Sequence, residues 1–181
     1  FIADNLVLLP IATPLLGAMI ALVIRRFPRA QSYGSLGAML LGLSFSLMLL
    51  WRVMDSGEAV VIQVGGWRFP YGISLVGDPL SALFAVMTQL VLASGLIYAL
   101  GSKDAVVTYP PFYPLFLMLA TGLTGAFLTG DLFNFFVFAE LLVISGTVLT
   151  AASDDRFGTE AAYKYYYMSL LASTFMLLAI G

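Results

Sequence analysis

Long apolar stretches separated by short polar ones set the pattern of this chain. Six of them are long enough to cross a membrane, because a helix needs about 20 mostly apolar residues to span the hydrocarbon core. They lie at 5–24, 30–51, 79–102, 105–130, 131–153 and 161–181. We therefore predict an all-α fold, a polytopic transmembrane helix bundle of about six spans, in which residues 1–181 form a single membrane domain.

The region 52–77 is the one polar segment of any length. Within it, VVIQV at 60–64 and WRFPYGISLV at 67–76 flank the pair Gly65-Gly66. Short β-rich runs around a glycine turn are typical of two strands joined in a hairpin. The pattern predicts a small extramembrane hairpin between the second and third spans.

Prolines modify two of the predicted spans. Pro10 and Pro14 fall in the first half of the first span, where neighbouring groups must satisfy the carbonyls that proline leaves free. Pro110, Pro111 and Pro114 open the fourth stretch, so its helical part is expected to begin near Phe112.

The fourth and fifth stretches are joined by little more than Thr129-Gly130-Asp131. So short a connection makes the two helices antiparallel neighbours. The fourth stretch also carries a run of small residues from Thr121 to Ala126, which favours close packing against other helices.

The composition agrees with a membrane protein and excludes several kinds of chemistry. Hydrophobic residues make up 61% of the chain and charged residues 10%, against about 25% charged in soluble domains. With no Cys and no His, disulfides and the usual zinc, copper and haem ligands are absent, so we expect neither cofactor nor metal. A net charge of −2 gives no basic patch for nucleic acid.

The basic residues of the loops predict the orientation. Three connections, the first, third and fifth, carry most of them, whereas the hairpin connection carries Arg52 and Arg68. The basic residues of the first set are Arg25, Arg26, Arg29, Lys103, Arg156 and Lys164. Because cytoplasmic loops are enriched in Lys and Arg, the N-terminus and the hairpin are expected to lie outside. The chain starts at Phe1 and stops at Gly181 in an apolar run, so we expect a piece of a longer polypeptide.

Glu140 stands alone among apolar residues in the fifth span. It follows Asp131 by nine residues, which at about 1.5 Å per residue places the carboxyl roughly 13–14 Å into a ~30 Å core. Carboxylates near the midplane are costly and usually mark ion or proton routes. The alternative is a structural role, in which a protonated Glu140 donates to a backbone carbonyl or to a Ser or Thr of a neighbouring helix.

The other charged residues have simpler interpretations. Asp131 and Asp78 each precede a span and are expected to be helix N-caps. Lys164 is expected about three residues into the last span, roughly 12 Å away from Glu140 in height, so direct contact is not expected. It either snorkels to the interface or acts as a polar step on the input side, linked to Glu140 by water.

Three segments resemble a known family. GGWRFPYGISLVGDPLSALF at 65–84, FYPLFLMLATGLTGAFLTGDLFNFFVFAELLVIS at 112–145 and EAAYKYYYMSLLASTFMLLAIG at 160–181 are similar to the antiporter-like membrane subunits of Mrp-type cation/proton antiporters, most of all to the one designated D. Proton-pumping subunits of complex I and of membrane-bound hydrogenases belong to the same superfamily. The most specific part is TGDLFNFFVFAE, in which an acid follows a Gly-Asp turn at fixed distance on an aromatic-rich helix.

The resemblance implies a function and a position in a larger assembly. By that likeness Glu140 matches the family's glutamate that relays protons, Lys164 matches a lysine at the start of the next helix, and 112–181 opens the first of two inverted repeats. The implied protein is an integral membrane subunit of a multisubunit Na⁺/H⁺ antiporter in a prokaryotic plasma membrane. Its partners would be protons, Na⁺ and other membrane subunits in the lipid bilayer.

Two alternatives remain open from the sequence. A proton-pumping subunit of a redox complex would have the same fold, with electron transfer elsewhere as its drive. A non-transporting scaffold subunit would keep Glu140 protonated and structural. The chain is not expected to be an enzyme by itself under any of these hypotheses.

Overall fold

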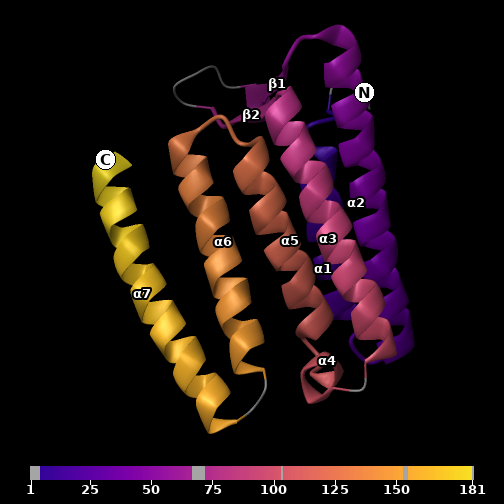
Figure 1. The fold of residues 1–181 in the computed structure, drawn as a ribbon, viewed down its shortest axis with the longest axis vertical. Coiled ribbons are helices and arrows are strands. Elements are labelled where there is room, and N and C mark those ends of the chain that lie inside the picture. The colour runs from indigo at the N-terminus through magenta and orange to yellow at the C-terminus, as the bar shows by residue number, and fades with distance from the viewer. Residues whose placement is uncertain (1–4, 67–71, 103, 153–154, 181) are drawn as a thin grey trace.

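Six long helices lie side by side, with a small hairpin across one end (Figure 1). The computed structural model describes residues 5–66, 72–102, 104–152 and 155–180. Within them the long helices are α1 Leu9–Val23, α2 Pro28–Ser56, α3 Pro79–Gly101, α5 Phe112–Leu128, α6 Leu132–Ala151 and α7 Arg156–Ile180. The predicted all-α bundle with its small hairpin is confirmed.

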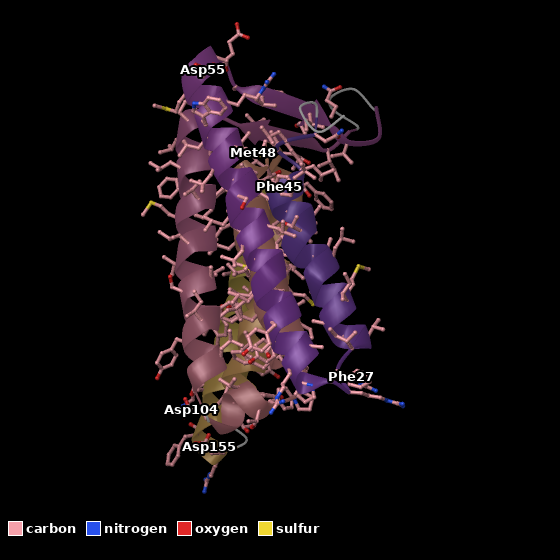
Figure 2. All side chains as sticks on the ribbon, turned by 90° about the vertical axis from the view of Figure 1, so that its right-hand side faces the viewer. Phe27, Phe45, Met48, Asp55, Asp104 and Asp155 are labelled. Carbon is pink, nitrogen blue, oxygen red and sulfur yellow. The ribbon has the colours of Figure 1, made fainter. Side chains whose placement is uncertain are left out.

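Three of the described helices have the length and composition of membrane spans. By length and composition α2, α3 and α6 could each cross a membrane, and α1 and α5 are apolar helices of 15 and 17 residues. Large apolar side chains cover the outside, such as Met19 and Val91 at 60% and 65% exposed. In Figure 2 the acids Asp55 and Asp104 lie at opposite ends of the bundle, with Met48 projecting between them.

The polar ends of the helices are fixed by local hydrogen bonds. Asp78 caps α3: its Oδ1 accepts from the backbone N–H of Ser81 at 2.6 Å, while the Ser81 hydroxyl accepts from the N–H of Asp78 at 2.9 Å. Asp131 caps α6 by accepting from the N–H of Phe133 at 3.2 Å. Both predicted N-caps are confirmed.

The hairpin joins β1 Val60–Gln63 and β2 Ser74–Gly77 as antiparallel strands, with Val60 opposite Gly77. The 3-10 turn η1 Val64–Gly66 follows β1, and Gly65 adopts a positive φ of 74° there. The part of the predicted second strand at 67–71 lies outside the described residues.

The hairpin also holds the turn between α5 and α6. Leu75 of β2 forms an isolated antiparallel bridge with Thr129, and the N–H of Gly130 donates to the Ser74 carbonyl at 2.9 Å. The sequence predicted the hairpin but not this contact. The strand therefore fixes the point at which the chain enters α6.

In the described part of the chain, two apolar clusters fill the bundle, one at each end. The cluster nearer the hairpin joins α1, α2, α3, α5 and β2. The other lies near the opposite end and joins α1, α2, α3 and α5. Their buried residues include Val7, Leu49 and Leu128 in the first, and Met39, Leu96 and Leu117 in the second.

A buried glutamine compensates for the proline inside α1. Pro14 has no N–H, so the carbonyl of Pro10 four residues earlier loses its helical partner. Gln89 of α3, fully buried, donates from Nε2 to the Pro10 carbonyl at 3.1 Å and to the Thr124 hydroxyl at 3.2 Å. One amide thus joins α1, α3 and α5.

A second buried glutamine holds the start of α5. Nε2 of Gln31 donates at 3.0 Å to the carbonyl of Pro110, which lies just before the N-cap of α5. The same nitrogen also donates to the Ala21 carbonyl near the end of α1, at 3.0 Å. The expectation that neighbouring groups satisfy the carbonyl freed by a proline of the first span is met at Pro10.

One predicted boundary is wrong. α7 begins at Arg156 instead of near residue 161, because the carboxylate of Asp155 accepts from the N–H of Gly158 at 2.5 Å and starts the helix in the polar turn. The apolar run marks where a helix enters the membrane, whereas its cap marks where the helix begins. A short helix, α4 Ala105–Thr108, also precedes α5 and was not predicted.

Candidate functional site

The helix that carries Glu140 lies against α5 at very short range. A Cβ added to Gly122 of α5 would come within 2.9 Å of the Phe138 carbonyl oxygen and the Leu142 nitrogen. At Gly125 an added Cβ would overlap the Phe138 ring. The small residues that the sequence singled out in this stretch therefore let the α6 backbone approach α5 directly.

A buried amide fixes the start of α6. Asn134 is 6% exposed and donates from Nδ2 to the Thr129 hydroxyl at 2.9 Å. Thr129 in turn bridges to β2 through Leu75. With the Asp131 cap, these contacts set the direction in which α6 leaves the turn.

Glu140 lies near the middle of α6, half-buried. At 100° per residue it is about 200° around the helix from Phe138, which packs against α5. The carboxyl is therefore on the side of α6 that faces away from α5. One face of α6 thus packs closely against α5, and Glu140 lies on the opposite face.

Among the described residues, Glu140 makes no hydrogen bond and no ion pair. The hydroxyls of Ser145 and Thr147 on the same helix are engaged with their own backbone, donating to Leu141 at 2.7 Å and to Val143 at 2.8 Å. The hydrogen bond that a structural role requires is thus not found in this part of the chain. Glu140 is a carboxyl without a fixed partner here.

Lys164 lies eight residues into α7, further along its helix than expected. The expected position three residues into the helix is wrong because α7 begins at Arg156. The next residue, Tyr165, lies beside Gly146 of α6, which follows Glu140 by six residues. Six residues are about 9 Å along a helix, so Lys164 and Glu140 remain at different heights.

The structure does not pair Lys164 with Glu140. Its Nζ donates to Glu160 of the same helix at 2.5 Å, and its side chain is 74% exposed. α7 packs mainly on α6, where the Tyr165 ring comes within 3.6 Å of a Cβ placed at Gly146. Lys164 and Glu140 thus lie on adjacent helices, and Lys164 is paired within its own helix.

Little of the α6–α7 pair is buried in the described residues. Asn134 and Ser145 are the buried residues of α6, and Ala162 is the buried residue of α7. In Figure 1, α7 stands at the edge of the bundle and leans away from α6 toward its C-terminal end. The surface around Glu140 is accordingly open to further packing.

Sequence reasoning missed Gln89 and Gln31 as fixed points of the fold. For Gln89 the signal was present, since Pro14 stands four residues after Pro10 and leaves its carbonyl without a helical donor. Which side chain would reach that carbonyl depends on helix packing. For Gln31 the sequence contains no comparable signal.

Known proteins resemble this chain over nearly its whole length. A protein named as antiporter subunit mnhD2 from Staphylococcus saprophyticus is 34% identical over 180 residues, 98% of this chain and 35% of the relative. That of Staphylococcus haemolyticus is 33% identical over 98% of this chain and 36% of its own length. The predicted resemblance to antiporter-like subunits is confirmed.

Solved structures show the same likeness. A chain of the Mrp complex from a Dietzia species superposes with a TM-score of 0.80 at 32% identity, over 97% of this chain and 33% of that one. A chain of the membrane-bound sulfane sulfur reductase, an archaeal respiratory membrane complex, gives 0.84 at 30% identity, over 96% of this chain and 36% of that one.

A family model for proteins related to the N subunit of NADH dehydrogenase I matches residues 103–180. The chain spans about a third of the length of the relatives it matches, and it fits their N-terminal part. Subunits of multisubunit membrane complexes are therefore its relatives, and the chain is an integral membrane protein.

Proposed function

We propose that this chain is part of the proton-translocating subunit of a multisubunit monovalent cation/proton antiporter. Glu140 is the titrating group, and protons and Na⁺ are the transported ions. The observation that carries the proposal is a carboxyl midway along an apolar helix, without a partner among the described residues, on the face that α5 does not cover. A midplane carboxyl of this kind is expensive to keep unless it serves an ion or proton route.

Lys164 is proposed as a step on the input side. Its partner Glu160 is an exposed residue on its own helix. An exposed ion pair is weak and exchanges readily with water. Water can therefore link Lys164 to Glu140 without direct contact between the two side chains.

The exposed surface of α6 and α7 supports the idea that this chain holds only part of the proton route. The relatives are about three times as long as this chain, and the described residues leave Glu140 half-buried. We propose that 112–181 opens the first inverted repeat and that other helices complete the route.

The decisive experiment replaces Glu140 in the full-length subunit within its complex. Glu140→Gln keeps size and hydrogen bonding and removes the titratable proton, so proton-coupled transport in vesicles is expected to be lost while assembly is unchanged. Glu140→Asp should retain part of the transport, limited by its shorter reach. Near-normal transport by a correctly assembled Glu140→Gln complex contradicts the proposal and favours the scaffold alternative.

A second candidate is a proton-pumping subunit of a redox complex, favoured by the likeness to the sulfane sulfur reductase chain. The two candidates differ in what drives the protons. Co-purification with small membrane subunits and Na⁺-dependent proton movement supports the antiporter. Co-purification with iron–sulfur proteins supports the redox pump.

We also propose that the hairpin lies on the outer side of a prokaryotic plasma membrane. The hairpin, the start of α1 and the end of α7 share one end of the bundle (Figure 1). Cysteine introduced at Ser56 should react with a membrane-impermeant reagent from outside. Reaction from the cytoplasm alone would reverse the orientation.

A further inference from the structure

A cationic cavity lies at the end of the bundle opposite the hairpin. It has a volume of about 480 Å³ and is formed by the start of α2, the end of α3 and the segment leading into α5. Arg25 and Arg29 supply its charge, and Ser32, Tyr33 and Tyr113 contribute hydroxyl groups. Such a site attracts a group that is negatively charged and accepts hydrogen bonds.

The start of α2 adds to this preference. No side chain caps the helix at Phe27, so its first N–H groups have no side-chain acceptor. The helix dipole also favours an anion at this end. Asp104, the nearest acid along the α3–α5 connection, already accepts from the Ser102 hydroxyl at 2.6 Å and does not line the cavity.

An apolar groove on the outside of the bundle adjoins the same region. It encloses about 380 Å³ between α1 and α2, and small residues create the space: Gly17, Gly34, Gly37 and Ala38. Gln31 lines both the groove and the cationic cavity. A charged cavity and an apolar groove thus meet at one residue, where the apolar spans end.

We propose that one anionic phospholipid occupies both places. Its phosphate lies between Arg25 and Arg29, and an acyl chain follows the groove between α1 and α2. Basic pockets between membrane helices are suited to anionic headgroups. A free anion would satisfy the arginines, but it would leave the adjoining groove without an occupant.

The groove is open without strain in the protein itself. A Cβ placed at Gly37 meets no atom within 4 Å, so a larger side chain there fills the groove and leaves the helix contacts intact. At Gly17 an added Cβ would come within 2.5 Å of the Ala38 Cβ, and the helices would have to separate. Gly37 is therefore the position for testing the acyl chain.

The test uses the full-length subunit, purified with the membrane subunits that accompany it. Native mass spectrometry measures the binding of added phosphatidylglycerol and phosphatidylcholine with identical acyl chains. The headgroup variant is Arg25→Gln with Arg29→Gln, each of which is also tested alone. The control for a single loss of charge is Arg26→Gln, since Arg26 does not line the cavity. The groove variant is Gly37→Leu, and its control is Leu40→Phe, an exposed neighbour outside the groove.

The expected result is one phosphatidylglycerol per chain that resists washing. Removing both arginines should weaken its binding roughly 30-fold, at about 1 kcal/mol per cation near the headgroup. Gly37→Leu should weaken binding of the lipid but leave unchanged the ability of inorganic phosphate to compete for the cavity. The two controls should bind as the unchanged protein does, and unfolding temperatures without lipid confirm that each variant is folded.

Three outcomes overturn the proposal. Full retention of phosphatidylglycerol by the double arginine variant removes the headgroup site. An equal loss of phosphatidylglycerol binding in the Arg26→Gln control shows that binding depends on general surface charge and not on the cavity. Inorganic phosphate that competes fully, together with no effect of Gly37→Leu, assigns the cavity to a free anion.

Discussion

Two regions of the bundle differ in whether their polar side chains are hydrogen-bonded to other helices. One is the four-helix unit of α1, α2, α3 and α5, and the other is the pair of α6 and α7. In the four-helix unit, Gln89 and Gln31 are buried and each joins neighbouring helices by hydrogen bonds. In the α6–α7 pair, Glu140 is half-buried without a partner among the described residues, and Lys164 is exposed. The buried amides of the first region thus join the backbones of neighbouring helices, whereas the acid of the second makes no such contact among the described residues.

The difference has a mechanical consequence. Breaking the hydrogen bonds of a buried amide in a low-dielectric interior is costly, so Gln89 and Gln31 hold their helices together. A half-buried carboxyl without a partner among the described residues makes no such link. The contact between α5 and α6 at Gly122 and Gly125, here called the α5–α6 seam, joins these two regions. Substitutions at this seam should have the largest effect.

The largest expected effect comes from the α5–α6 seam. Gly122→Ala places a methyl group against the α6 backbone and should destabilise the protein by about 1–3 kcal/mol, with transport falling as α6 shifts. The control is Gly37→Ala, which meets open space and should stabilise its helix by up to about 1 kcal/mol. Thermal unfolding of the two variants measures the contrast, and equal effects would refute close packing at the seam.

The next effect tests the buried amide of the four-helix unit. Gln89→Leu leaves the Pro10 carbonyl unpaired and should cost about 1–3 kcal/mol. In a Pro14→Ala background the restored N–H supplies a helical donor to Pro10, so Gln89→Leu should cost less. A double-mutant cycle on unfolding free energies measures this coupling. Strict additivity would show that the amide does not serve the proline.

A smaller effect concerns the cap of α3. Hydrogen bonds from Ser81, first from its hydroxyl and then from its backbone N–H, lower the pKa of Asp78. A carboxyl whose pKa is lowered on folding stabilises the protein above its unfolded pKa of about 3.9, and this is lost as the pH falls through the folded value. Asp78→Ala should cost about 1 kcal/mol at neutral pH. Unfolding measured against pH should show that difference shrinking in acid.

The smallest effect on stability is expected at Lys164. Its ion pair with Glu160 is exposed, so Lys164→Ala should change the free energy of unfolding by less than about 1 kcal/mol. Proton-coupled transport should fall less than in Glu140→Gln, because water can replace a side chain near the interface. Glu160→Ala is the control, since it breaks the same pair and leaves the lysine. Transport lost as completely as in Glu140→Gln would make Lys164 an obligatory relay.

The sequence by itself determined the spans, the hairpin and the candidate site. Apolar runs near 20 residues can cross a bilayer only as helices, so the spans could be predicted without knowing how they pack. Asp78 and Asp131 each cap the helix that follows them, so the caps could be predicted in the same way. The proline before Phe112 likewise set the start of α5 correctly. The position of Glu140 on an apolar helix followed from counting residues.

Only the tertiary structure decided which groups meet. Gln89 reaches Pro10 across 79 residues of sequence, and Ser74 reaches Gly130 through the hairpin. The face of α6 that carries Glu140 was likewise settled when Gly122 and Gly125 drew Phe138 against α5. These contacts depend on how helices rotate about their own axes, and an apolar run that is nearly uniform around the helix does not specify that rotation.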